Sequence, residues 1–243
     1  MNRPLTLISS RFLALVATVS LAVALAPSGQ AALTTVTWLL NPAGSNAPVG
    51  SSNQVFTSQG YSITAYGFDI GNGGNATAHE LFYKNAGGDE FGLGLVGTPH
   101  NELQLANGNT GPAQFIQLDL HSILNAGFTN GKIQTGSVQT NESFVLYGSN
   151  TLGTLGTKLG NTFGSNFDMA FLSAPNFGTY KFLSVAAGSA DVLPVAFQAD
   201  ICPVPEMQTL FPIIGLIVAV AASDILRRRR SSRLKPVRAG TEG

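Results

Sequence analysis

Four oxygen-bearing side chains stand close together in the sequence and could bind a cation: Asp89, Glu90, Asn101 and Glu102. Carboxylate and amide oxygens are hard ligands of the kind that calcium prefers, and glycine-rich backbone nearby could supply further carbonyl oxygens. The preferred interpretation is nevertheless a solvated acidic turn without a bound ion. The sequence therefore predicts no cofactor, with calcium as the alternative.

Catalytic motifs are weak in this chain. Residues 87–91 spell Gly-Gly-Asp-Glu-Phe and residues 92–97 spell Gly-x-Gly-x-x-Gly, but neither string stands between the strand and helix that a nucleotide site needs. The three histidines are scattered. A hydrolase would need two carboxylates, such as Asp89 and Glu102, at a defined separation across a cleft. Nothing in the sequence places them there, so we expect no enzyme.

The C-terminal end has three parts in a fixed order. The tripeptide Val204, Pro205 and Glu206 precedes an apolar run over residues 210–226, and the run ends at Arg227, Arg228, Arg229 and Arg230. A helix of these 17 apolar residues would be roughly 26 Å long, near the lower limit for spanning a membrane. A basic cluster keeps its end of such a helix in the cytoplasm. The pattern predicts one transmembrane helix followed by a cytoplasmic tail, residues 227–243.

This order of motif, apolar helix and basic cluster resembles the sorting signal of the PEP-CTERM family of exported bacterial proteins. Met207 stands where a second proline is common in that family. The resemblance implies handling by an exosortase, a membrane protease, and delivery from the inner membrane to the cell surface or extracellular matrix. Residues 88–95 and 115–120 also resemble a recurring ectodomain type of the family, for which the resemblance implies no activity.

The N-terminal end carries an export signal. Arg3 and Arg11 precede an apolar run over residues 12–26, and small residues at Gly29 and Ala31 follow. A charged start, a short apolar core and a small-x-small exit are typical of a signal peptide cleaved by signal peptidase. We expect cleavage after Ala31, which places the mature N-terminus outside the cytoplasm. A retained anchor is the alternative.

The region between the two signals is acidic. Residues 32–206 contain eleven carboxylates, four lysines and no arginine, for a formal charge of −7. A negative charge of this size argues against nucleic acid as a partner. The only cysteine, Cys202, excludes an internal disulfide, so the fold depends on packing. Its place beside the tripeptide suggests a linkage, and an incidental thiol is the preferred interpretation.

Short apolar segments separated by Gly- and Asn-rich turns predict an all-β fold, an antiparallel β-sandwich or jelly roll. We expect a signal peptide over residues 1–31, a sandwich over 32–201 with one helical turn at 122–126, and a sorting region over 202–243. The expected strands are residues 34–40, 61–68, 79–84, 91–96, 115–120, 132–138, 143–147, 167–172, 180–186 and 192–201.

Two functions remain open for such a domain. The first is a structural or interaction role at the cell surface or in the extracellular matrix. The alternative is a carbohydrate-binding module of jelly-roll type, calcium-assisted, that recognises exopolysaccharide through exposed aromatic rings. Its candidate rings are Tyr61, Tyr66, Phe68 and Tyr83, although aromatic residues at strand spacing usually belong to a core.

Overall fold

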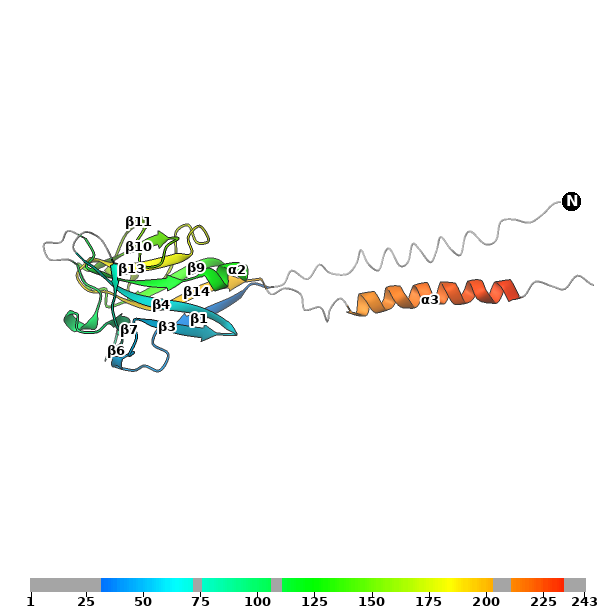
Figure 1. The fold of residues 1–243 in the computed structure, drawn as a ribbon, viewed down its shortest axis with the longest axis horizontal. Helices are drawn as coiled ribbons and strands as arrows, with labels where there is room; N and C mark the ends of the chain where they lie inside the picture. Colours follow the sequence, from blue (N-terminus) through cyan, green and yellow to red (C-terminus); the bar gives the residue numbers. More distant parts are fainter. Residues whose placement is uncertain (1–31, 72–75, 106–110, 203–210, 234–243) are drawn as a thin grey trace, which may run out of the picture. The chain divides into compact units, whose positions relative to one another are not determined.

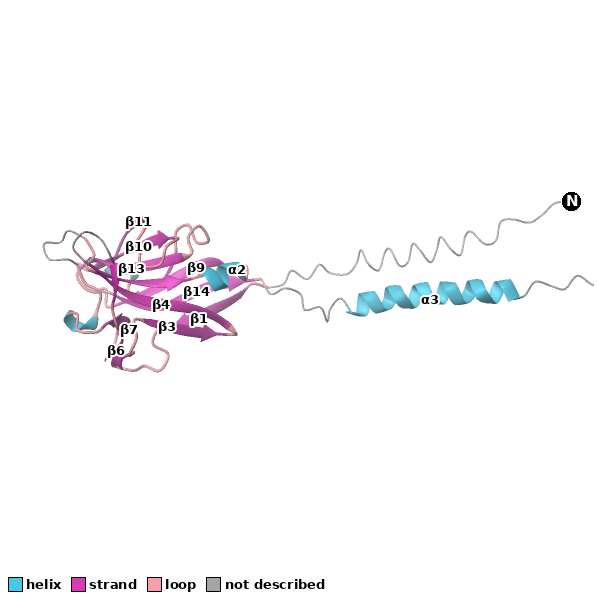
Figure 2. Ribbon diagram, viewed as in Figure 1, coloured by secondary structure: helices cyan, strands magenta, loops and turns pink. Residues whose placement is uncertain are grey.

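The computed structural model describes residues 32–71, 76–105, 111–202 and 211–233. The chain divides into two compact units, one of which is residues Leu33–Pro203, and the regular structure of that unit is almost entirely β-strand (Figures 1 and 2). The predicted cleavage at Ala31, the tripeptide Val204, Pro205 and Glu206, and residues 234–243 lie outside the described part.

Two antiparallel sheets form the body of the strand-rich unit. The first has the order β1 (Thr34–Leu39), β14 (Leu193–Ile201), β9 (Thr129–Gly136) and β12 (Phe171–Ser173). The second has the order β11 (Thr157–Gly164), β10 (Ser143–Ser149), β13 (Phe182–Ser189), β8 (Gln114–Asp119), β4 (Tyr61–Ile70) and β3 (Asn53–Ser58), and β5 (Ala76–Ala78) also pairs with β4.

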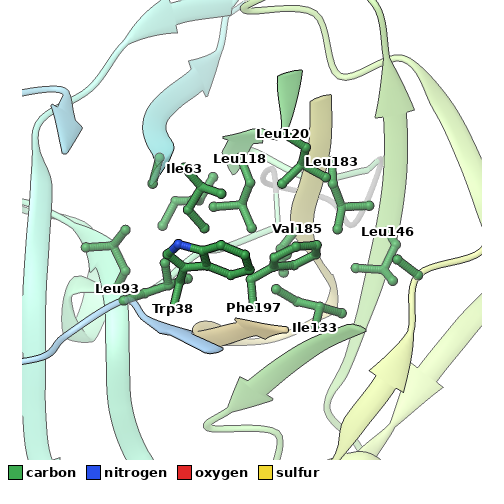
Figure 3. Packing of buried hydrophobic residues seen from close by; sticks show 14 of the residues in the cluster. Trp38, Ile63, Leu93, Leu118, Leu120, Ile133, Leu146, Leu183, Val185 and Phe197 are labelled. Carbon is green, nitrogen blue, oxygen red and sulfur yellow. The ribbon is translucent and has the colours of Figure 1, made fainter. Parts of the chain in front are cut away.

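The core lies between these sheets. Trp38 on β1 and Phe197 on β14 are fully buried and pack ring against ring, with centroids 5.9 Å apart. Apolar side chains of the second sheet, among them Ile63, Leu118 and Val185, surround them (Figure 3). The Trp38 indole N–H donates to the Tyr61 carbonyl oxygen at 2.9 Å, which satisfies the one polar atom of this ring and links β1 to β4.

A third, small sheet consists of β2 (Ala47–Pro48), β6 (Leu81–Gly87) and β7 (Glu90–Leu95). Strand β7 alternates buried leucines with glycines, and the glycines allow close approach. A Cβ at Gly92 would lie 2.7 Å from the Pro194 carbonyl oxygen, and one at Gly94 would overlap the Asn101 carbonyl oxygen. The glycines therefore let β14 and the segment around Asn101 lie directly against β7.

Short helices complete the fold. The 3-10 turns are η1 (Pro99–Asn101) and η2 (Ser165–Phe167), and α2 (His121–Asn125) confirms the helical turn predicted at residues 122–126. Helix α3 (Phe211–Arg233) belongs to the other unit and covers most of the segment predicted to cross the membrane. Among the described residues, no helix is both long and apolar enough to cross a membrane.

The prediction of an all-β fold with antiparallel sheets is confirmed. All ten predicted strand segments contain or overlap an observed strand. Two six- to eight-residue strands were not predicted: β3, in a stretch for which no element was predicted, and β11, in a stretch where glycines indicated turns.

Candidate functional site

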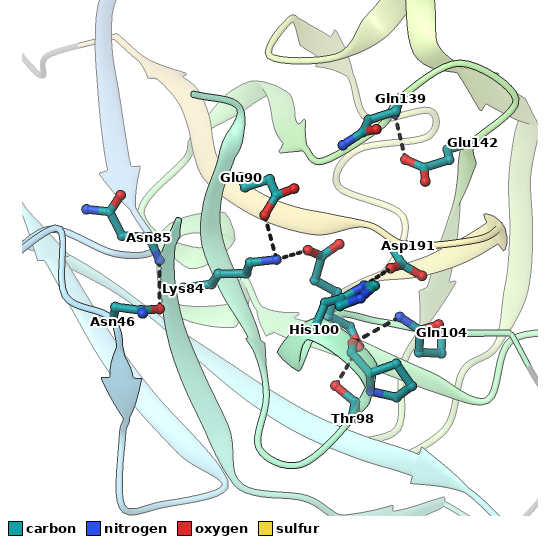
Figure 4. A network of polar contacts seen from close by, with 12 residues as sticks. Asn46, Lys84, Asn85, Glu90, Thr98, His100, Gln104, Gln139, Glu142 and Asp191 are labelled. Atoms are coloured by element: carbon teal, nitrogen blue, oxygen red, sulfur yellow. Dashed lines mark hydrogen bonds and ion pairs between the residues drawn. The ribbon is translucent and has the colours of Figure 1, made fainter. Parts of the chain in front are cut away.

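A buried lysine with two carboxylate partners is the most unusual polar feature of the sandwich. The Lys84 ammonium on β6 contacts Glu102 Oε1 and lies 3.0 Å from Glu90 Oε2 on β7 (Figure 4). Lys84 is 6% exposed and Glu102 is 1% exposed. Charged groups are rarely buried unless they are paired, because leaving water is costly. The three side chains therefore form one ion-paired cluster, which we call the Lys84 cluster.

The backbone of both buried residues is held by further hydrogen bonds. The Lys84 carbonyl oxygen accepts from Asn41 Nδ2 at 2.9 Å, and Asn41 is itself buried. The Glu102 amide donates to the Pro99 carbonyl oxygen at 3.2 Å, and its own carbonyl accepts from Thr98 Oγ1 at 2.8 Å. Turn η1 therefore fixes the direction from which Glu102 enters the cluster.

Burial and pairing act on the protonation of this cluster. Burial raises the pKa of Glu102 above its usual value, and the Lys84 hydrogen bond offsets only part of this rise. Burial lowers the pKa of Lys84, but the hydrogen bonds to Glu102 and Glu90 outweigh it, so that the net shift is upward. The Ser137 hydroxyl lies near enough to lower the Glu102 pKa. Even so, Glu102 Oε2 is buried and accepts no hydrogen bond of normal geometry.

More acidic groups surround the cluster. The exposed His100 ring pairs with Asp191 at 2.9 Å, and this hydrogen bond raises the His100 pKa. Burial raises the pKa of Asp168, and the nearby Asp89 raises it further. Burial likewise raises the pKa of Glu142. This end of the sandwich thus concentrates negative charge around one buried ammonium.

The structure brings together two of the four predicted metal ligands. Glu90 and Glu102 meet, but the Lys84 ammonium stands between them, where a cation was expected. The Asn101 amide oxygen accepts from the Gly97 N–H at 3.0 Å, and Asp89 lies beside Asp168 instead. Within the described ranges, no group of three or more His, Cys, Asp or Glu side chains is arranged to hold a metal ion.

Lys84 was missed in the sequence, although a signal was present. It lies in the apolar segment LFYK, three residues after Leu81, and both side chains are buried. A lysine within an apolar strand indicates either an edge position or a buried ion pair. The sequence does not show which carboxylate, 18 residues further on, would meet it.

A groove lies at the other end of the first sheet. It has a volume of about 540 Å³ and is lined in part by Asn130, Lys132, Ser173, Phe177 and Asp200. The pairing of β14 with β9 shows where the groove lies on this sheet. Asp200 pairs with Thr129 at the groove end, and Leu193 pairs with Gly136 at the opposite end, near the Lys84 cluster. The groove combines hydroxyl, amide, amino and carboxylate groups with one aromatic ring.

None of the four aromatic residues predicted to bind a polysaccharide lines this groove. Phe68 is buried and stacks on Phe115, with ring centroids 5.0 Å apart. Tyr61 packs edge-on against Phe128, and Tyr83 packs edge-on against Phe56. Tyr66 is half-buried beside Phe68. The rings therefore serve mainly to fill the interior.

Comparison with known proteins gives no relative. The chain matches no family model, no curated protein and no solved structure.

Proposed function

We propose that this chain is an exported structural or interaction protein of the bacterial cell surface or extracellular matrix, sorted by a C-terminal signal of the PEP-CTERM type. The observation that carries the proposal is the order of the tail. The tripeptide at Val204, Pro205 and Glu206 precedes a helix, and the arginines from Arg227 follow its apolar part.

The surface of the helix supports this proposal. Leu216, Ile217 and Val218 on α3 are each about 60% exposed, and so is Leu226. Such side chains need an apolar environment, and a bilayer supplies one. The predicted apolar stretch begins at Leu210, one position before the described helix. Its length of 17 residues is at the short limit for a membrane-spanning helix.

The geometry of the sandwich also suits display at a surface. Its first and last strands pair side by side, with Thr34 opposite Ile201. Both chain ends therefore leave the sandwich from one place, and the Lys84 cluster lies at the other end of the first sheet. A domain attached through its last strand would keep that acidic end free for contact with other molecules.

The proposal is tested by replacing Pro205 and Glu206 with alanine in a host that contains an exosortase. We expect the natural chain to lose its tail and reach the surface or the medium, and the variant to remain longer and in the membrane fraction. Alanines at the neighbouring Met207 and Gln208 serve as the control. Equal mass and location of all three proteins would contradict sorting by this motif.

The groove favours carbohydrate as a second candidate function, in the manner of a jelly-roll binding module. Sugar hydroxyls are bound by planar amide and carboxylate groups together with an aromatic face, and Asn130, Asp200 and Phe177 line the groove. Asp200 is already held by Thr35 and Asn130, so its oxygens are oriented without a ligand. No nucleic acid is proposed as a partner, because the domain is acidic.

A glycan array with the full chain in detergent tests this second candidate. We expect Lys132→Ala to weaken binding about tenfold, which corresponds to the loss of one charge-assisted hydrogen bond. Lys158→Ala is the matched control, since Lys158 is exposed and donates a hydrogen bond to Thr162 on its own strand β11. If the chain binds none of the glycans, carbohydrate binding is rejected and only the first proposed function remains.

A further inference from the structure

The Lys84 cluster contains a nucleophile and an electrophile held in contact away from water. Lys84 Nζ touches Glu102 Oε1, so the Glu102 carboxyl carbon is the next atom in its reach. The other carboxyl oxygen, Oε2, is buried and accepts no hydrogen bond of normal geometry, although the Ser137 hydroxyl lies nearby. A carboxylate with one unpartnered buried oxygen is costly as an anion, whereas a neutral acid or an amide carries less charge.

A third group is placed to move protons. Glu90 Oε2 lies 3.0 Å from Lys84 Nζ, and its side chain is 35% exposed, so it can exchange protons with solvent. Burial raises the pKa of Glu102, so its neutral acid form is easier to reach than in an exposed glutamate, and the Glu90 carboxylate can then balance the ammonium charge. Hydrogen bonds to the carbonyl oxygens of Lys84 and Glu102 hold the backbone from which both reacting side chains project, and such fixed positions are the usual source of a high effective concentration.

We propose that the folded chain joins Lys84 to Glu102 through an isopeptide bond between Nζ and Cδ. The Lys84 ammonium gives one proton to the Glu90 carboxylate, and the neutral amine attacks Cδ of the Glu102 acid. Glu90 then returns its proton to the departing hydroxyl group and takes up one of the two protons on the attacking nitrogen, and the other proton stays as the amide N–H. One N–C bond forms, one C–O bond breaks, one water leaves, and Glu90 ends protonated before it releases its proton to solvent.

The bond would join the small three-stranded sheet to the segment that follows η1. Lys84 lies in the three-stranded sheet, while Glu102 precedes Leu103, which forms an isolated bridge with Val192 just before β14. The link would close the β6–β7 hairpin and η1 into a covalent loop. Restricting the unfolded chain in this way stabilises the folded state.

Peptide mapping of the purified full chain tests the bond. Trypsin does not cut after a lysine whose Nζ is an amide, so we expect a single peptide that runs through Lys84 and ends at Lys132. Its mass should be one water molecule less than that of the unlinked sequence, and fragmentation should place the link at Lys84 and Glu102. Complete cleavage after Lys84, with the full mass of both peptides, would overturn the proposal.

Variants separate reaction from mere proximity. Lys84→Arg keeps the positive charge but should give unlinked chain, as should Glu102→Ala. Glu102→Gln can form the same amide by releasing ammonia, so it should yield a linked peptide of the same mass as the natural one. Glu90→Gln should leave a large unlinked fraction. Chain that is kept in denaturant from its synthesis onward, and so has never folded, should be unlinked and should lose one water only after refolding. Failure to lose that water on refolding would also contradict the proposal.

This inference does not depend on the proposed sorting. A linked chain that stays in the membrane would contradict sorting alone, and an unlinked chain that reaches the surface would contradict the bond alone.

Discussion

Charged side chains of the sandwich are held in place by specific polar neighbours rather than by water alone. Lys84 has two carboxylates, and Asp200 has two neutral donors. Asp200 Oδ1 accepts from Thr35 Oγ1 at 2.6 Å, and Oδ2 accepts from Asn130 Nδ2 at 3.1 Å. The Glu102 and Asp200 carboxylates thus join segments that are distant in sequence, so protonating either one should change the stability of the fold.

Asp200→Asn should destabilise the protein in a pH-dependent way. The Thr35 hydrogen bond lowers the pKa of Asp200 in the folded state, so its contribution is present above the unfolded pKa and is lost as pH falls through the folded one. We expect the variant to lose about 1 kcal/mol at neutral pH, a value discounted for solvent screening. Denaturant unfolding at pH 7 and well below pH 4 measures the difference, which should vanish at the lower pH.

Thr35→Val provides the comparison for that experiment, because it removes the shorter of the two hydrogen bonds but leaves the carboxylate. Thr35→Val should lower the free energy of unfolding at pH 7 by less than Asp200→Asn does, and it should also make that free energy less dependent on pH. Equal stability of Asp200→Asn and the natural chain at pH 7 would mean that the two donors do no more for Asp200 than water does.

At the scale of elements, alternation of apolar residues predicted the strands that have a buried face. Strand β1 buries Val36 and Trp38, and strand β8 buries Ile116 and Leu118. In each strand these apolar residues are two positions apart, which is the pattern that predicted the strand. The unpredicted strands β3 and β11 lie at the two edges of the second sheet, and each buries one side chain, Phe56 or Leu159. A strand with one buried residue has no clear period of two, and its pairing is imposed by its neighbour.

The candidate site was predictable only in part, for a similar reason. The sequence showed that Glu90 and Glu102 follow neighbouring turns, which favoured their meeting. It did not show that His100 and Asn101 both take left-handed backbone conformations, with φ of 56° and 57°, which redirect the chain just before Glu102. Nor did it show that Lys84 would occupy the space between the two carboxylates. Those features depend on contacts between separate elements.

For the whole molecule, the uneven distribution of charge is the dominant electrostatic feature. Residues 32–206 carry a formal charge of −7, and a majority of the described carboxylates of the sandwich lie near the Lys84 cluster, where several raise one another's pKa. Lys84 and the exposed His100 offset only part of this charge. Repulsion at that end should therefore oppose folding at low ionic strength, by up to about 1 kcal/mol for a close pair in water.

Added salt should consequently raise the melting temperature. A comparison of sodium chloride with calcium chloride then shows whether calcium binds. Because the Lys84 side chain occupies the space between Glu90 and Glu102, we expect sodium chloride and calcium chloride to act equally at matched ionic strength, through screening alone. Thermal unfolding of the natural chain and of a variant with Asp89→Asn and Asp168→Asn measures this. The variant should respond less to either salt, since one repulsive pair is gone. An extra rise with millimolar calcium, lost in the variant, would instead show a calcium site at these carboxylates, because a ligand that binds only the folded state stabilises it by mass action.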